Sequence, residues 1–159
     1  MKHELVRLGP DDWKTFRDVR LRSLAEAPAA FGSRYDDWVS APEERWRARL
    51  TDVPLNVIAR IEGETVGVAS GMLEDAEWAE LISMWVDPSA RGTAVAHDLI
   101  GAVVEWAAEQ GRSLNLMVRS DNARAIRAYE KAGFVDCGVP HDWPADEPPE
   151  SRMEHRREA

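Results

Sequence analysis

Alternating hydrophobic and polar residues predict four strands in the first half of the chain. An edge strand covers residues 3–8, where a Gly-Pro pair ends the alternation. The next two strands cover 56–61 and 65–72, and the residues between them, Glu62-Gly63-Glu64, favour a hairpin turn. Another strand follows over about 77–86. The last three segments therefore predict an antiparallel meander.

Four segments have apolar residues at the spacing of an amphipathic helix. The first ends near Ala27 after an acidic start, and the second opens at Pro42, whose ring suits a first helical turn. The third is the longest, Arg91–Glu109, and the fourth covers 122–131 with Asp121 or Asn122 as its cap. A glycine follows each of the last two segments and is expected to end the helix.

A strand over Leu114–Val118 follows the longest helix. Because a helix intervenes, this strand is expected to lie parallel to Leu81–Val86 through a right-handed crossover. Two more strands are predicted over Phe134–Cys137 and Ser151–His155, with a surface loop rich in Pro, Asp and Glu between them. The pattern predicts a mixed α/β fold in a single domain, residues 1–159.

Composition narrows the classes of function. The 44% hydrophobic and 31% charged content is ordinary for a globular protein, and no apolar run approaches the roughly 20 residues of a membrane helix. We therefore expect no membrane partner. A formal charge of −9 argues against nucleic acid as a partner and favours a cationic substrate. The single cysteine and the absence of a secretory apolar core near the start favour a cytoplasmic protein.

A loop of small residues marks the beginning of the longest predicted helix. It contains Arg91, Gly92, Thr93, Ala94, Val95 and Ala96. Short side chains allow successive backbone N–H groups to approach an anion, and the positive end of the helix dipole favours one. The arginine adds a cation suited to phosphate oxygens. The loop has no P-loop lysine, and no GxGxxG follows the first strand, so neither of those nucleotide sites is indicated.

A second candidate segment is the helix over 122–131. Asn122 and Tyr129 are seven residues apart, so they share a helix face and lie about 10 Å apart along the axis. An amide near the strand end and a phenol two turns further on are thus able to line one groove.

Together these segments resemble the GNAT superfamily of acetyl-CoA-dependent N-acetyltransferases. The resemblance rests on Val86-Asp87-Pro88, on Arg91-Gly92-x-Ala94-x-Ala96, and on Asn122…Ala125…Tyr129-Glu130…Gly133-Phe134. The motifs span about residues 81–138, and the N-terminal strand, two helices and hairpin also fit the family. The resemblance implies a central, mostly antiparallel sheet of about six to seven strands, splayed between Leu81–Val86 and Leu114–Val118 and flanked by about four helices.

The resemblance also implies how acetyl-CoA is held as a co-substrate. The backbones of Met84 and Val86 are expected to pair with the pantetheine arm, and Asn122 to contact it. The amides from Arg91 to Ala96 are expected to hold the pyrophosphate. Ala94 stands where the family usually has glycine, and this change is tolerable if the backbone there is ordinary helix.

Two residues are candidates for catalysis. By the resemblance, Tyr129 lies near the sulfur and protonates the leaving thiolate; a core tyrosine is the alternative. The attacking amine needs a base, and Glu80 stands where histone-type members carry theirs, although a solvated strand-end acid would look the same. Members that modify protein N-termini often have glutamate at the position of Met117, so methionine argues against that mechanism.

The remaining candidates are weaker. The four histidines lack metal-ligand spacing, so no metal is predicted; His97 is expected to be a half-exposed helical residue. Cys137 has no evident histidine partner for an acyl-enzyme. The loop 28–33 is expected to connect two helices or to form a wall of the substrate cleft. Trp78 or Trp85 is expected at an acceptor pocket or a dimer surface if not in the core.

Two functions follow for the chain as a whole. One is transfer of an acetyl group from acetyl-CoA to a primary amine, on a small molecule or a peptide, by direct attack in a ternary complex. The alternative is a non-catalytic acyl-CoA-binding module with a sensory or regulatory role. Exposed aromatics and the final strand are compatible with a homodimer.

Overall fold

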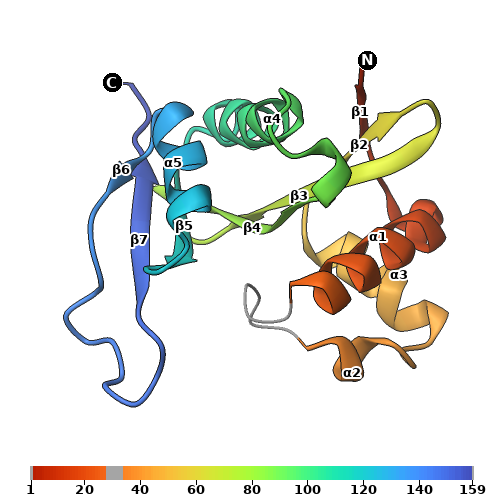
Figure 1. Ribbon diagram of the computed structural model, residues 1–159, viewed down its shortest axis with the longest axis horizontal. Helices are drawn as coiled ribbons and strands as arrows, with labels where there is room; N and C mark the ends of the chain where they lie inside the picture. Colours follow the sequence, from red (N-terminus) through yellow and green to blue (C-terminus); the bar gives the residue numbers. More distant parts are fainter. Residues whose placement is uncertain (1, 28–33, 159) are drawn as a thin grey trace.

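A seven-stranded sheet runs through the molecule and carries helices on both faces (Figure 1). The computed structural model describes residues 2–27 and 34–158. The strands are β1 (Glu4–Arg7), β2 (Leu55–Ile61), β3 (Glu64–Leu73), β4 (Trp78–Val86), β5 (Ser113–Arg119), β6 (Val135–Asp136) and β7 (Glu150–His155). The helices are α1 (Trp13–Glu26), α2 (Tyr35–Trp38), α3 (Glu43–Asp52), α4 (Val95–Glu109) and α5 (Ala123–Lys131), with 3-10 turns at Pro10–Asp12 and Pro88–Ala90.

The sheet order is β1-β2-β3-β4-β5-β7-β6, and every neighbouring pair is antiparallel except β4 and β5. The predicted mixed sheet, its edge strand and its parallel crossover are therefore confirmed. The hairpin between β2 and β3 turns at Glu62 and Gly63, which have φ values of 51° and 82°. Positive φ at both central residues is what a type I′ hairpin turn requires.

Each face of the sheet has its own apolar core. Helices α1 and α3 cover one face, where Phe16 and Trp46 pack against Ile58 and Val68. Helices α4 and α5 cover the other face (Figure 1). Helix α4 lies close to β3 because Gly71 has no side chain: a Cβ there would meet the Trp106 ring at 2.6 Å.

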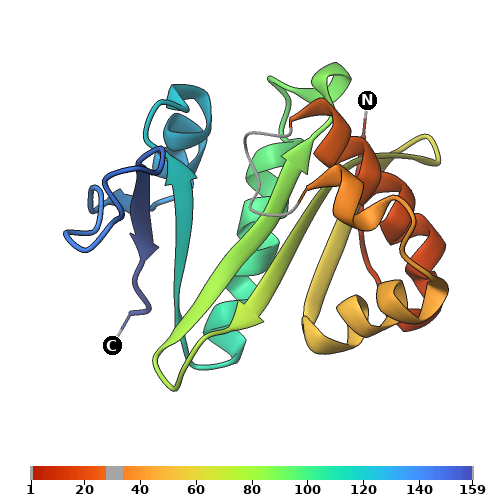
Figure 2. The ribbon, with the colours of Figure 1, turned by 90° about the horizontal axis from the view of Figure 1, so that it is seen from below.

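The sheet opens between β4 and β5, as predicted. The two strands pair only at Trp78–Ser113, Ala79–Leu114 and Glu80–Asn115, and beyond Glu80 they separate. Figure 2 shows β4 and β5 close together at one end and far apart at the other. Among the described residues, β4 therefore has a strand neighbour, β3, on one side only from Leu81 to Val86.

A bulge in β4 lies beside this opening. Ser83 has a φ of 57°, and the register with β3 shifts between the pairs Ser70–Ile82 and Val68–Trp85. In a regular strand Leu81 and Trp85 would share a face. Here Leu81 belongs to the core under α4, whereas Trp85 belongs to the core under α1, because the bulge adds one residue.

The structure corrects several predicted boundaries. The longest helix begins at Val95 instead of Arg91, because a 3-10 turn and Gly92, with a φ of 79°, interrupt the chain before it. Strand β6 contains only Val135 and Asp136, and the four-residue helix α2 had no sequence signal. The loop 28–33 lies outside the described residues, so its predicted role is untested.

Candidate active site

Two cavities meet where β4 and β5 separate. The first, of about 610 Å³, lies between the start of α4 and the helix α5. The second, of about 310 Å³, lies among α1, β4 and β5. Four residues line both: Met84, Asn122, Ala125 and Tyr129. A molecule in the first cavity can therefore meet a molecule in the second at Tyr129.

The predicted anion-binding loop forms one end of the first cavity. Arg91, Gly92, Thr93 and Ala96 line it, whereas Val95 is buried in the core. In the described part of the chain, no acceptor is assigned to the N–H groups of Gly92, Thr93, Ala94 and Ala96; that of Val95 donates to Thr93 Oγ1 at 3.3 Å. These unpaired donors stand at the positive end of the α4 dipole, the arrangement that binds a phosphate oxygen.

The alanine in this loop occupies an ordinary conformation. Ala94 is the N-cap of α4 with φ −74° and ψ −4°, and it is exposed. An L-residue adopts these angles without strain. The substitution for the family's usual glycine therefore leaves the backbone of the loop unaffected, and Gly92 alone takes the positive φ that the turn requires.

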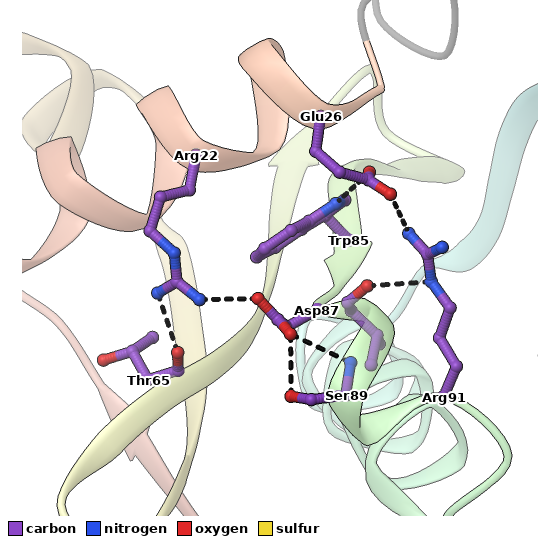
Figure 3. A network of polar contacts seen from close by, with 8 residues as sticks. Arg22, Glu26, Thr65, Trp85, Asp87, Ser89 and Arg91 are labelled. Carbon is purple, nitrogen blue, oxygen red and sulfur yellow. Dashed lines mark hydrogen bonds and ion pairs between the residues drawn. The ribbon is translucent and has the colours of Figure 1, made fainter.

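The arginine of the loop is held by the end of α1 (Figure 3). Arg91 donates to Glu26 Oε1 at 2.8 Å and from Nε to the Val86 carbonyl at 3.1 Å. Glu26 also accepts from the Trp85 indole at 2.9 Å. That hydrogen bond, followed by the interactions with Arg91, keeps the pKa of Glu26 below its ordinary value despite partial burial. The side chain of Arg91 is thus a fixed part of the cavity wall.

A second set of contacts from α1 fixes the turn after β4. Arg22 on α1 donates to Asp87 Oδ2 at 2.7 Å and to the Thr65 carbonyl at 2.9 Å. Asp87 accepts from the Ser89 hydroxyl and backbone N–H, and these bonds lower its pKa. Asp87 therefore acts as a turn residue.

Asn122 and Tyr129 share a cavity-lining face of α5, as their spacing predicts. Asn122 is the N-cap, and its Oδ1 accepts from the Ala125 N–H at 3.2 Å. Tyr129 is 8% exposed, with its ring edge-on to Phe134. Burial raises the pKa of Tyr129, and no described residue hydrogen-bonds its hydroxyl. The phenol is therefore protonated at neutral pH, with its hydroxyl available where the cavities join.

Helix α5 also brings cations that the sequence analysis did not single out. Arg124, Arg127 and Lys131 line the first cavity, and all three are exposed. None of them forms an ion pair within the described residues. Their spacing of three and four residues places them on one helix face, and this periodicity was the available signal. The protein has a net charge of −9, yet these three residues of α5 form a basic rim at the first cavity.

Glu80 lies at the other cavity. It is the last residue of β4 that pairs with β5, and its partly buried side chain lines the second cavity. Burial, then the nearby charge of Glu74, raises the pKa of Glu80 above its ordinary value. Met117 lines the same cavity.

The structure also places the weaker candidates. His97 is exposed at the edge of the first cavity, and Cys137 is exposed. Trp85 is a core residue, whereas Trp78 is half-buried, with Arg152 and Arg156 over its ring. Within residues 2–27 and 34–158, no three His, Cys, Asp or Glu side chains are grouped as metal ligands would be. In the same ranges no helix is long and apolar enough to cross a membrane.

Known proteins share this fold. A GNAT-family acetyltransferase from Streptococcus pneumoniae superposes with a TM-score of 0.77 at 18% identity, covering 96% of this chain and 98% of that one. The yncA protein of Salmonella typhimurium, solved with its cofactor acetyl-CoA, gives a TM-score of 0.73 at 16% identity, covering 100% of this chain and 96% of that one. At these identities the likeness concerns the fold.

Sequence comparison adds relatives that are longer than the matched segment. MJ1207 of Methanocaldococcus jannaschii, described as an uncharacterized N-acetyltransferase, is 30% identical over 93 residues, which are 54% of this chain and 41% of MJ1207. The matched segment thus spans less than half of that relative's length. The model of the Acetyltransferase (GNAT) family matches residues 16–134. That match covers more than half of the chain, including both cavities' meeting point, and the chain therefore belongs to the GNAT family of acetyltransferases.

Proposed function

We propose that this protein transfers an acetyl group from acetyl-CoA to a primary amine by direct attack in a ternary complex. The observation that carries the proposal is the pair of cavities that meet at Met84, Asn122, Ala125 and Tyr129. One cavity suits the donor and the other the acceptor. Reactants held on opposite sides of one junction need no covalent enzyme intermediate.

The chemistry of the first cavity suits an anionic, elongated donor. The amides of Gly92, Thr93, Ala94 and Ala96 have no acceptor within the described residues, which suits a pyrophosphate, and the basic rim of α5 supplies further positive charge. The segment of β4 around Met84 and Val86 has no second strand neighbour in the described part of the chain, which suits pairing with the amides of a pantetheine arm. The carbonyl of Val86 already accepts from Arg91, so we assign its N–H to this role and the backbone of Met84 beside it.

Tyr129 is the proposed general acid. When the amine attacks the thioester carbon, the C–S bond breaks and the sulfur leaves as a thiolate. A thiol of pKa ~8.5 is a moderate leaving group, and a phenol that stays protonated at neutral pH can donate a hydrogen bond to the developing charge and then a proton. The hydroxyl of Tyr129 is buried and has no hydrogen-bond partner among the described residues, which suits this role.

Glu80 is the proposed general base, acting directly or through a water molecule. Amines have pKa values of roughly 8 to 10, so the attacking nitrogen must lose a proton. A carboxylate whose pKa is raised by burial is a stronger base than a solvated one. Glu80 and Tyr129 both line the second cavity, so acid and base flank the space given to the acceptor.

The experiment compares Tyr129→Phe with Tyr35→Phe, a change at the chain's other tyrosine. Tyr35 is 37% exposed on α2 and lines neither cavity. Thiol release with acetyl-CoA and a panel of amines gives kcat, and calorimetry gives the Kd for acetyl-CoA. We expect Tyr129→Phe to lower kcat by ~10² or more with little change in Kd, whereas Tyr35→Phe changes neither.

The outcomes separate the enzyme from an acyl-CoA-binding module. If the parent binds acetyl-CoA but none of the amines in the panel causes thiol release, the binding module is favoured. If Tyr129→Phe acetylates an identified amine as fast as the parent, the proposed acid is wrong. If acetyl-CoA does not bind, both functions fail.

A further inference from the structure

The second cavity has a basic wall on the side of α1. Arg20 lines it although this residue is only 8% exposed, and burial together with the nearby charge of Arg49 lowers the pKa of Arg20 to about 10. A guanidinium with that pKa still carries its charge at neutral pH.

A second buried guanidinium stands behind the same wall. Arg49, from α3, donates to Asn56 Oδ1 at 2.8 Å, to Ser70 Oγ at 3.2 Å and to Ser83 Oγ at 3.1 Å. All three acceptors are neutral, and no described carboxylate pairs with Arg49. Burial lowers the pKa of Arg49 to about 10 as well. Two positive charges are therefore concentrated on one side of the cavity.

Ser83 links the buried Arg49 to the surface of the second cavity. Its bulged position in β4 lines the second cavity, and its Oγ accepts from Arg49. A serine hydroxyl that accepts from a cation still has its own proton to donate. No described residue receives that proton, so the hydroxyl is available to an oxygen of a ligand.

Acidic side chains occupy other parts of the same cavity. Glu80 on β4 and Glu150 at the start of β7 both line it. The cavity thus has a basic wall at Arg20 and Ser83, acidic groups at Glu80 and Glu150, and one further cation, Arg119, which pairs with Asp121. At about 310 Å³ it is near the lower limit of small-molecule sites.

We infer that the acceptor is a small amino acid-like molecule, whose carboxylate binds at Arg20 and Ser83 while its amine faces the junction at Tyr129. The inference rests on the proposed function and names its substrate class. It differs from the cationic acceptor that the net charge of −9 favours, because the charge lining the cavity, not the total charge, contacts the substrate. A charge-assisted bond to a carboxylate is among the stronger polar contacts.

The test uses amines in matched forms. Each amino acid is compared with its carboxamide and with the amine that lacks the carboxylate altogether. Because the carboxamide has nearly the same shape, the ratio of kcat/KM for the two isolates the charge. We expect the carboxylate to be preferred by about tenfold or more.

Substitutions assign the preference to this wall. Arg20→Gln is expected to bring the ratio close to one without changing the Kd for acetyl-CoA, and Arg20→Lys to retain part of it. Ser83→Ala tests the same wall from another element if Arg20→Gln does not fold. Arg17→Gln is the matched control, since Arg17 is a more exposed α1 arginine that lines neither cavity.

A binding measurement makes the test independent of turnover. N-acetylamino acids and their amides, as product analogues, are titrated into the protein with and without CoA and followed by NMR. Tighter binding of the acids, lost in Arg20→Gln or Ser83→Ala, supports the inference. Equal binding or equal kcat/KM of acids and amides overturns it and leaves the proposed acetyl transfer standing, whereas an inability to bind acetyl-CoA overturns the proposed function itself.

Discussion

At the scale of single residues, the anion-binding loop shows how backbone conformation decides which side chain is tolerated. Gly92 has a φ of 79°, where a Cβ is strained, whereas Ala94 has the ordinary helical φ of −74°. The two positions are two residues apart and face the same proposed ligand. Only the first needs glycine.

We predict that Gly92→Ala weakens acetyl-CoA binding about tenfold, because left-handed backbone costs an L-residue ~1–2 kcal/mol and the loop would shift to relieve it. No atom lies within 4 Å of the added Cβ, so the cost is conformational. Ala94→Gly is the matched change and is expected to alter the Kd by less than about twofold. Calorimetry checks both; a large gain in affinity from Ala94→Gly would show that the alanine impairs the loop.

Glu80 predicts a pH dependence. Its raised pKa means that the base becomes ionised only above the ordinary range of glutamate, so kcat should fall as the pH drops through that shifted value. Glu80→Gln is expected to lower kcat and remove this limb of the profile. Ionisation of the free amine, at about pH 8 to 10, affects kcat/KM in parent and variant alike.

The control for this profile is Glu77→Gln, at an exposed acid just before β4 that lines neither large cavity. It should leave the profile unchanged. Persistence of the acidic limb in Glu80→Gln would assign the base to another group.

At the scale of elements, the end of α1 is tied to the turn that follows β4 and to the anion-binding loop. Glu26 accepts hydrogen bonds from Trp85 and Arg91 (Figure 3). Arg22 donates a hydrogen bond to Asp87. One helix thereby positions residues from both cavities, since Arg20 lies on the same helix. The boundaries of α1 were predictable from its periodicity, but these pairings join residues about 60 positions apart and had no local signal.

Glu26→Gln is predicted to lower the free energy of unfolding by about 1 kcal/mol near neutral pH, a value limited by the partial exposure of the ion pair. The pKa of Glu26 is lower in the folded than in the unfolded protein. Its contribution is therefore fully present above the unfolded pKa and is lost as the pH falls through the folded pKa.

Urea unfolding of parent and variant is measured from about pH 2 to about pH 7, because this range covers the pKa values of carboxyl groups. Glu105→Gln, at an exposed acid on α4 without an ion pair among the described residues, is the control and should stay within ~0.5 kcal/mol. A difference for Glu26→Gln that persists undiminished in acid would contradict the electrostatic explanation.

At the scale of the whole molecule, the sheet opens between β4 and β5 (Figure 2). Residues at this opening line both cavities. Strand periodicity, the hairpin at Glu62-Gly63 and the helix end at Gly111 were readable from the sequence because each depends on near neighbours. Gly111 illustrates this: its N–H and that of Arg112 bond back to Ala108 and Ala107, a local motif. The opening itself was expected only from the family resemblance.

Other features depended on distant contacts. The bulge at Ser83 is supported by a hydrogen bond from Arg49 on α3, and Arg20 lines the second cavity from α1. Neither arginine stands out in a chain with 20 basic residues. The start of α4 was misplaced because the motif from Arg91 to Ala96 is helical in spacing but turns at Gly92.

The most direct measurement is a crystal structure of the protein with CoA. We predict the diphosphate on the N–H groups of the loop from Gly92 to Ala96, the pantetheine beside Met84 and Val86, and the sulfur beside the Tyr129 hydroxyl, where the two cavities meet. Density for CoA that leaves the start of α4 empty, or a sulfur directed away from Tyr129, would contradict the account.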